Sequence, residues 1–273
     1  MWAVRRGLLP KGLRAVAPWQ WSLEPFTVYG PGCKFRWFPT PYDAIGHEIF
    51  WTGLTRWESE TAPVMLDHFC RSRCFLDIGA NTGIYTVMAC AANPRIRVVA
   101  FEPVPRMYEA LKGNVAGNHF DARVTTLNVA LAAFDGIAPF HEAEDSTMGS
   151  LEVNGYQGQR GKVIQVECRT LDSVVEELNL QPDFLKIDVE GFESAVLEGA
   201  GRVLSAFRPA LVVEANPGDP AGRISEILSR LGYEFLNLTR SGPQRREWIH
   251  PVEGDRNWLC VPANAVNRSL SYS

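Results

Sequence analysis

One stretch constrains the fold most: an apolar segment that leads directly into a glycine-containing turn. Residues 75–87 read FLDIGANTGIYTV, and residues 98–103 read VVAFEP. The first stretch predicts a buried strand, a tight turn and the start of a helix, and the second predicts the next strand, which ends in an acid. A nucleotide-like cofactor needs this arrangement, because glycine lets the backbone approach the ligand and a carboxylate about 20 to 25 residues further on can bind ribose hydroxyls.

Length, charge and cysteine content narrow the class of protein. The 273 residues suffice for one large α/β domain with an appendage, or for two small domains. The net charge of −4 argues against a general nucleic-acid binder, and no apolar run reaches the roughly 18 residues of a transmembrane helix. The six cysteines are scattered without a zinc-binding spacing, which is typical of reduced thiols, so we expect a cytoplasmic location.

The first 70 residues differ in composition from the rest of the chain. They contain six of the eight tryptophans and many prolines. We predict that residues 1–70 form a partly irregular N-terminal cap, with short strands at TVYG and CKFRWF and a helix near residues 58–70. The tryptophans either line a substrate pocket or provide packing area, since each ring buries a large surface.

From residue 74 onward, strand patterns alternate with helical patterns. Strands separated by helices of this length predict a parallel sheet with right-handed crossovers. The predicted strands are 74–78, 97–101, 124–131, 183–189 and 210–216, and the predicted helices are 84–92, 105–118, 193–204 and 221–231.

Two segments depart from this alternation. Residues 134–170 are polar and rich in glycine, and we predict a hairpin plus a loop over one edge of the sheet. Residues 233–238 and 257–262 have no helix between them and should pair antiparallel. The predicted fold class is α/β, with a mostly parallel seven-stranded sheet that ends in an antiparallel hairpin. This is the Rossmann-like architecture of class I methyltransferases that use S-adenosylmethionine, and we assign residues 71–273 to such a domain.

The glycine turn supplies the first candidate site residues. Asp77 ends the first strand, and Gly79, Ala80, Asn81 and Gly83 belong to the turn that follows. Open α/β sheets bind ligands outside the carboxyl ends of their strands, so these five residues are candidates for cofactor binding. Asp77 can accept a hydrogen bond from the cofactor's ammonium group or fix the loop. The alternative is a plain strand-to-helix turn in which the glycines serve as caps.

The next two strand ends extend the predicted cofactor site. Glu102 follows the second strand, where its carboxylate can accept hydrogen bonds from two ribose hydroxyls. Pro103 turns the chain and can flank the adenine, and Asn128 and Ala130 come from the third strand at the edge that borders the adenine. The alternative for Glu102 is a solvated acid that opens the following helix.

Charged residues at the end of the fourth strand are the candidates for catalysis. Lys186, Asp188 and Glu190 alternate in FLKIDVEG, which places them on one side of an extended strand. Charges there are costly unless they are paired or used. We predict that Asp188 holds the acceptor beside the transferable methyl group and that Asp188 or Glu190 takes the acceptor's proton. The alternative is a structural ion pair of Lys186 with a carboxylate.

A metal-assisted reaction stays open but is not indicated. Asp188, Glu190 and Glu214, the acid that ends the next strand, can gather a divalent ion. None of the five histidines has a recognisable metal-binding spacing. We therefore assign no metal ligand.

With these residues, the chain resembles the FkbM family of S-adenosylmethionine-dependent methyltransferases from about Trp57 to Asn216. The KIDVEG-x-E segment with the VL-x-GA that follows it is the most specific part of the resemblance. The similar blocks, in order, are FLDIGANTGIYT, VVAFEPVPRMYEALKGNV, LNVAL, TLDSV, LKIDVEGFESAVLEGA and RPALVVEAN.

The resemblance implies S-adenosyl-L-methionine as methyl donor and an oxygen acceptor on a sugar, a polyketide or another small molecule. It carries the cofactor role onto five positions of this chain, namely Asp77, Gly79, Asn81, Gly83 and Glu102. It says less about the separate roles of Lys186, Asp188 and Glu190. The acceptor stays unidentified, because substrate selection usually depends on caps and loops outside the similar blocks.

Two other functions remain as alternatives. A nicotinamide-dependent oxidoreductase can be built on a similar sheet, but its usual GxGxxG is absent, since Ala80 and Asn81 follow Gly79. A methyltransferase-like binding module that has lost turnover is the second alternative. Acids at four strand ends (Asp77, Glu102, Asp188 and Glu214) argue against it. The expected partner is a small-molecule or glycan acceptor, without nucleic acid.

Overall fold

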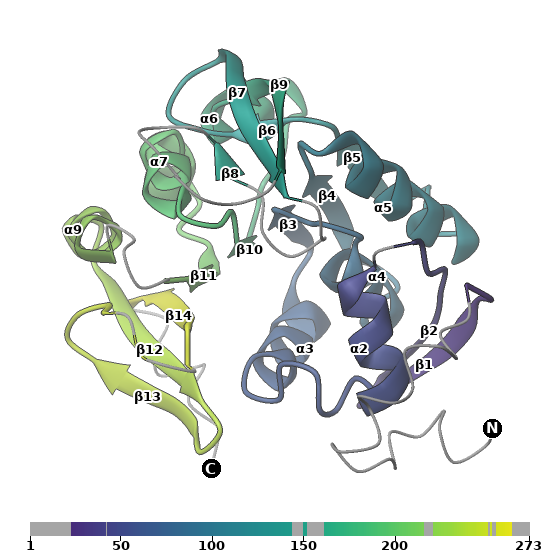
Figure 1. The fold of residues 1–273 in the computed structure, drawn as a ribbon. Helices are drawn as coiled ribbons and strands as arrows, with labels where there is room; N and C mark the ends of the chain where they lie inside the picture. Colours follow the sequence, from purple (N-terminus) through teal and green to yellow (C-terminus); the bar gives the residue numbers. More distant parts are fainter. Residues whose placement is uncertain are drawn as a thin grey trace.

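A twisted sheet, parallel in its central part, organises the molecule. The computed structural model describes residues 23–41, 43–143, 150–151, 161–215, 221–250, 252 and 255–263 (Figure 1). Within these residues the main sheet has the strand order β13-β12-β14-β11-β10-β3-β4-β5. Strands β11, β10, β3, β4 and β5 pair in parallel, and β14, β12 and β13 pair antiparallel. Their bounds are β3 (Cys74–Ile78), β4 (Arg97–Phe101), β5 (Val124–Leu127), β10 (Phe184–Ile187), β11 (Ala210–Glu214), β12 (Tyr233–Thr239), β13 (Gly242–Arg246) and β14 (Asn257–Pro262).

Helices cover both faces of this sheet. One core cluster contains side chains of α3, α4 and α5, and a second contains side chains of α6, α7, α8 and α9. Among the described helices, none combines the length and the apolar character needed to cross a membrane. The bounds are α3 (Ala62–Arg71), α4 (Ile84–Ala92), α5 (Pro105–Gly117), α6 (Leu171–Glu177), α7 (Glu193–Glu198), α8 (Gly201–Ala206) and α9 (Ala221–Arg230).

The predicted fold class is confirmed, with one correction. The sheet is mostly parallel and ends in an antiparallel pair, β12 with β14. It has eight strands rather than seven, because β13 pairs with β12 in a segment that we expected to be a loop. The sequence of β13, GPQRR, has no apolar alternation and none of its residues is buried, so no hydrophobic pattern marks it.

The N-terminal cap packs on the face of the sheet that carries α3 and α4. Strands β1 (Phe26–Gly30) and β2 (Cys33–Trp37) lie at the two predicted short strands and pair antiparallel, and α3 corresponds to the helix expected near 58–70. Helix α2 (Ala44–Thr52) was not predicted. Side chains of β1, β2 and α3 belong to the same core cluster as those of α4, so these elements of the cap provide packing area for the domain core. The proposed boundary between residues 70 and 71 stays a prediction.

Two predicted elements are each split in the structure. The strand expected at 124–131 becomes β5 in the main sheet and β6 (Ala130–Leu131) in another sheet, because the chain bends at Asn128. The Asn128 side chain holds that bend by donating to the backbone oxygens of Glu102 and Pro103. The helix expected at 193–204 becomes α7 and α8. Gly199 and Ala200 lie between them, and Gly199 passes so close to the chain after β6 that a Cβ there would lie 2.1 Å from the Ala132 oxygen.

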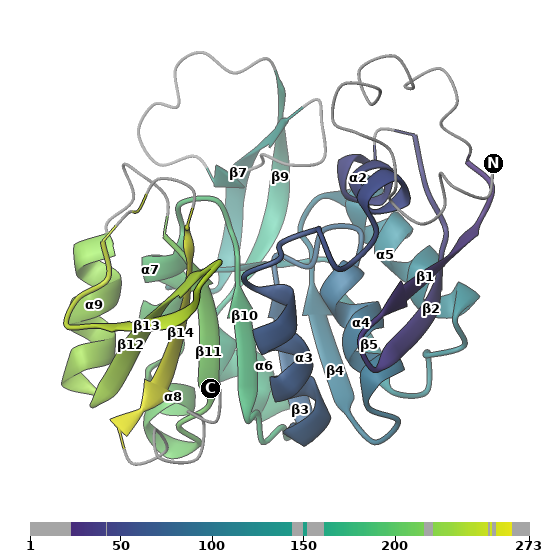
Figure 2. The same cartoon turned by 90° about the horizontal axis from the view of Figure 1, so that it is seen from below.

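The glycine-rich insertion forms a separate small sheet. Strand β7 (Gly136–Ala143) pairs antiparallel with β9 (Gly161–Arg169), and with β6 and β8 (Ser150–Leu151) they form a sheet of order β6-β9-β7-β8. Figure 2 shows β7, β9 and α2 on the side of the main sheet where β10 has its carboxyl end. The rest of the expected loop, 144–149 and 152–160, lies outside the described residues.

A buried asparagine fastens the cap to the glycine turn. Asn114 of α5 is fully buried, accepts from Phe38 N at 2.8 Å and donates to the Thr82 oxygen at 2.9 Å. We expect Asn114→Ala to lower the free energy of unfolding by about 3 kcal/mol, because two backbone groups lose buried partners. Urea unfolding measures this. Asn118→Ala is the control, and its loss should stay below about 1 kcal/mol because water can replace its more exposed bonds to Arg36. Equal losses in the two variants would contradict this role.

Candidate functional site

A cavity of about 500 Å³ lies at the carboxyl ends of β3, β4, β10 and β11. This is where open α/β sheets bind ligands. Its walls also include residues 56–60 of the segment between α2 and α3, and Phe140 and Glu142 of β7. The predicted site residues among its lining residues are Asp77, Gly79, Ala80, Asn81, Glu102, Pro103, Ala130, Lys186, Asp188 and Glu190.

The glycine turn passes directly over the end of β10. Gly79 has φ +79°, and a Cβ on it would lie 1.8 Å from the Asp188 backbone oxygen, so only glycine fits there. The Gly79 and Ala80 N–H groups both donate to the Phe101 oxygen, at 3.1 and 2.9 Å. The turn is therefore fastened to β4 and brings its backbone to the cavity wall.

Two of the predicted cofactor residues do not line the cavity. Gly83 has φ +92° and precedes α4, and a Cβ on it would lie 2.5 Å from Leu111 Cδ1 of α5. It lets α4 begin close to α5. Asn128 instead supports the backbone of Glu102 and Pro103. Both residues therefore support the residues that line the cavity without lining it themselves.

Glu102 joins the ends of β3 and β4 through its carboxylate. Oε2 accepts from Asn81 N and Oε1 accepts from Val104 N, both at 2.8 Å. The residue is 5% exposed. Burial raises the pKa of Glu102 to about 7, although these two N–H groups lower it. Its charge can therefore change near neutral pH.

Asp77 has one buried oxygen without a partner among the described residues. Thr86 Oγ1 donates to Oδ2 at 2.6 Å, and Oδ1 accepts no hydrogen bond. Burial raises the pKa of Asp77, with Lys186 acting in the opposite direction. A buried acceptor without a partner is costly, so a donor group of a ligand in the cavity would stabilise it.

A buried ion pair lies beside this turn. Lys186 is 3% exposed, and its Nζ lies 2.6 Å from Asp188 Oδ2. Burial lowers the pKa of Lys186. The carboxylates of Asp188, Glu58 and Asp77 together raise it by a larger amount, so the net shift is upward. Burial raises the pKa of Asp188, but the charge of Lys186 and the hydrogen bonds with Glu214 and Lys186 together lower it by more, so the net shift is downward and Asp188 is ionised.

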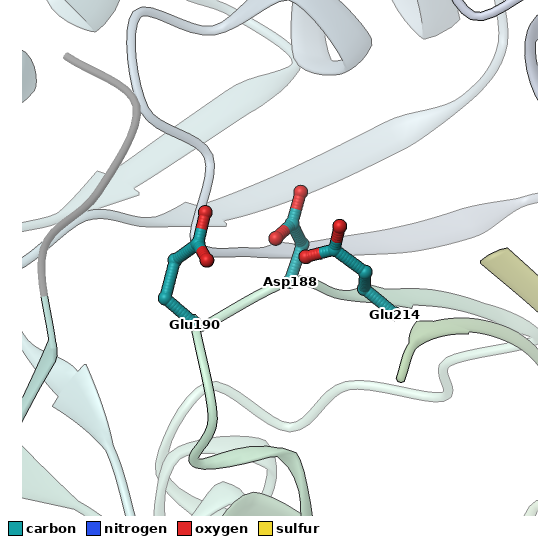
Figure 3. Close-up of side chains that lie close together, drawn as sticks. All are labelled: Asp188, Glu190 and Glu214. Carbon is teal, nitrogen blue, oxygen red and sulfur yellow. The ribbon is translucent and has the colours of Figure 1, made fainter. Parts of the chain in front are cut away.

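Glu214 and Glu190 complete the acidic cluster (Figure 3). Burial and the neighbouring Asp188 carboxylate raise the pKa of Glu214, and the two side chains share a hydrogen bond. Oxygens of Asp188, Glu190 and Glu214 lie within 4.8 Å of one another. Our expectation of an extended strand through Glu190 is wrong, because β10 ends at Ile187 and Glu190 has φ +51°. The left-handed turn brings Glu190 to the cluster instead.

Sequence reasoning missed two residues next to this ion pair. The Tyr85 hydroxyl, in the first turn of α4, donates to Glu58 Oε2 of the cap. Lys186 Nζ lies 4.9 Å from the Tyr85 ring centroid, and the Trp57 ring lies 5.1 Å from the Tyr85 ring. Glu58 lies at the start of the helix that we expected near 58–70, where nothing marked it as a site residue, and α3 begins only at Ala62. Tyr85 was visible in the GIYT block, but it looked like an ordinary apolar helix residue.

Comparison with known families identifies the chain. The methyltransferase FkbM domain matches residues 77–235, which is more than half of the sequence. The protein belongs to the FkbM methyltransferase family. This membership confirms the resemblance seen in the sequence and favours methyl transfer over a nicotinamide-dependent reaction.

Individual relatives are distant. The chain is 29% identical to AMB antimetabolite synthetase AmbE of Pseudomonas aeruginosa over 58% of its length, but it covers only 9% of that protein. It is 26% identical to hexuronic acid methyltransferase AglP of Haloferax volcanii, over 68% of this chain and 74% of AglP. It is 28% identical to 31-O-demethyl-FK506 methyltransferase FkbM of Streptomyces tacrolimicus, over 61% of this chain and 74% of that protein.

Proposed function

We propose that this FkbM-family protein transfers a methyl group from S-adenosyl-L-methionine to a hydroxyl group of a sugar or another small molecule. One observation carries the proposal: the glycine turn and the Lys186–Asp188 pair line the same cavity. A donor held at the turn and an acceptor held at the pair would therefore meet in one space. The names of AglP and FkbM describe a hexuronic acid and an oxygen position as acceptors, which supports this class.

The residues at β3 and β4 fit the donor. Asp77 Oδ1 is a buried acceptor that has no partner among the described residues, which suits the ammonium group of the donor's amino-acid part. Gly79 keeps the wall free of side-chain atoms, and Glu102 presents a carboxylate suited to ribose hydroxyls. When bound, S-adenosyl-L-methionine supplies a methyl group on a positively charged sulfur. We assign the remaining contacts to Ala80, Asn81, Pro103 and Ala130, with Gly83 and Asn128 supporting them.

The charged residues at β10 and β11 suit the acceptor. Asp188 is held ionised by Lys186, so it can accept a hydrogen bond from an acceptor hydroxyl and orient its oxygen. Glu190 lies in the same cluster and offers a second acceptor for a neighbouring hydroxyl. Lys186 keeps the negative charge of Asp188 stable at a half-buried position. Orientation of this kind can lower the barrier by roughly 7 to 11 kcal/mol.

The metal-assisted variant remains unassigned. The cluster of Asp188, Glu190 and Glu214 has oxygens close enough to share an ion, but an ammonium group already lies against Asp188. No metal ligand is proposed. The six cysteines are free thiols, which supports our proposal of a reducing, cytoplasmic compartment.

The test is donor binding followed by methyl transfer. Calorimetry with S-adenosyl-L-methionine and with NAD should show binding of the first only. Labelled donor is then incubated with the full chain, a panel of methyl glycosides and methyl glycuronosides, and extracted small metabolites. Label in an alkali-stable methyl ether supports the proposal. Donor binding without transfer to any of these compounds supports a silent binding module, and binding of NAD alone contradicts the proposal.

A further inference from the structure

The short segment between α2 and α3 is built into the cavity. Arg56, Trp57, Glu58, Ser59 and Glu60 all line it. Glu58 has φ +40°, a left-handed conformation that is unfavourable for a residue with a side chain. Such strain persists only where the surroundings impose it, and it is concentrated at functional sites.

Several contacts impose this conformation. The Glu58 backbone oxygen accepts from Thr61 N and Ala62 N, at 2.9 and 2.8 Å, at the start of α3. The Trp57 side chain is buried and packs on Tyr85. The backbone of Glu58 is therefore anchored by a helix on one side and an aromatic contact on the other, and its side chain is directed into the cavity.

The Glu58 carboxylate keeps one oxygen available. Oε2 accepts from the Tyr85 hydroxyl, and no other side-chain hydrogen bond or ion pair of Glu58 occurs among the described residues. Asp188 differs from it, because its carboxylate is bound to both Lys186 and Glu214. A carboxylate that is already neutralised by an ammonium group is a weak base, so Asp188 suits holding a hydroxyl better than deprotonating it.

We propose that Glu58 is the general base that takes the proton of the acceptor hydroxyl, a role that rests on the proposed function. The O–H bond of the acceptor breaks, and the proton goes to a Glu58 carboxylate oxygen. The electron pair stays on the acceptor oxygen, which forms the new bond to the methyl carbon as the electrons of the carbon–sulfur bond leave with sulfur. The proton then passes from Glu58 to solvent, which restores the carboxylate.

The electrostatics of Glu58 agree with this role. Burial raises the pKa of Glu58 to about 7, although Lys186 and the Tyr85 hydroxyl lower it. A base works best when its pKa is close to the working pH, since it is then largely ionised and still accepts a proton readily. The Tyr85 hydroxyl fixes the carboxylate's orientation, and we assign Tyr85 as a positioning residue.

The first test is turnover of Glu58→Gln, which keeps the size of the side chain and an oxygen for the Tyr85 hydroxyl. On whichever panel compound accepts methyl, kcat should fall about 100-fold, with KM and donor affinity nearly unchanged. The rise of kcat/KM through about pH 7 should disappear. Glu109→Gln is the control, since Glu109 is an exposed residue of α5 outside the cavity lining and should keep wild-type kinetics. Wild-type turnover in Glu58→Gln overturns the proposal.

The second test needs neither donor nor acceptor. A carboxyl whose folded pKa is raised contributes stability below its unfolded pKa, and this contribution is lost as pH rises to the folded pKa. The difference in melting temperature, Glu58→Gln minus wild type, should therefore increase by about 5 °C between about pH 5 and pH 8. The same comparison for Glu109→Gln, an exposed position outside the cavity lining, provides the baseline. If the melting-temperature difference stops changing by about pH 5, Glu58 is already ionised there, and the proposal is overturned.

These two tests separate the inference from the proposed function. If donor binding and methyl transfer occur and Glu58→Gln is fully active, only the base assignment is wrong. If no panel compound or metabolite accepts methyl, the proposed function is wrong in its reaction. The pH trend of the melting temperature then still shows whether Glu58 has the raised pKa that a base in this cavity needs.

Discussion

Asp188→Asn should lower turnover at least about tenfold while leaving the affinity for S-adenosyl-L-methionine almost unchanged. The substitution keeps the shape of the side chain and removes the negative charge that Lys186 stabilises. A charge-assisted hydrogen bond to the acceptor hydroxyl becomes a neutral one, which is weaker and less directional. Initial rates with labelled donor measure the loss, and calorimetry measures donor affinity. Equal turnover in the variant would remove Asp188 from the chemistry.

The same variant should also be less stable, which must be separated from its catalytic effect. Lys186 is 3% exposed and would lose its nearest counter-charge, and breaking a buried pair in this way costs about 3 kcal/mol. The double variant Lys186→Met with Asp188→Asn removes both charges and should recover most of that stability. Its turnover should stay low. Recovery of turnover together with stability would show that the pair is structural only, which was the alternative from the sequence.

The central sheet and the cofactor side of the cavity could be predicted from local sequence. Strands β3, β4 and β10 are almost entirely buried, so they appear as mostly apolar runs with a charged residue at or directly after their carboxyl ends. Gly79 marks a place where no side chain fits, because the backbone of β10 passes within contact distance. The ends of parallel strands meet at one edge, and this brings Asp77, Glu102 and Asp188 to one cavity without further information.

The remaining features depend on contacts between distant segments. The bend at Asn128 depends on backbone oxygens of residues 102 and 103, which no pattern around residue 128 reveals. Strand β13 exists because β12 offers a free edge, since its own residues have no apolar alternation. Glu58 contacts Tyr85 across 27 positions of sequence, which no local pattern around either residue reveals. Tertiary contacts of this kind override local signals.

Glu102→Ala should weaken the binding of S-adenosyl-L-methionine about 100-fold. In the proposed complex the carboxylate loses two hydrogen bonds to ribose hydroxyls, each worth about 1.5 kcal/mol or more because the acceptor is charged. The Asn81 and Val104 N–H groups also lose their partner, so the turn and the end of β4 are no longer fastened together. Calorimetry with the donor measures the affinity, and urea unfolding measures the stability lost with the two backbone bonds.

Glu102→Gln separates the two effects. The amide oxygen can keep one of the two backbone N–H partners, so stability should fall less than in the alanine variant, while the charge for ribose is gone. Because the pKa of Glu102 is raised to about 7 by burial, the wild-type carboxylate is ionised above that pH and protonated below it. Donor affinity of the wild type should therefore rise between about pH 6 and pH 8, and that of Glu102→Gln should not. A wild-type pH trend that persists in Glu102→Gln, or unchanged affinity in Glu102→Ala, would assign Glu102 to the loop alone and leave the ribose without its carboxylate.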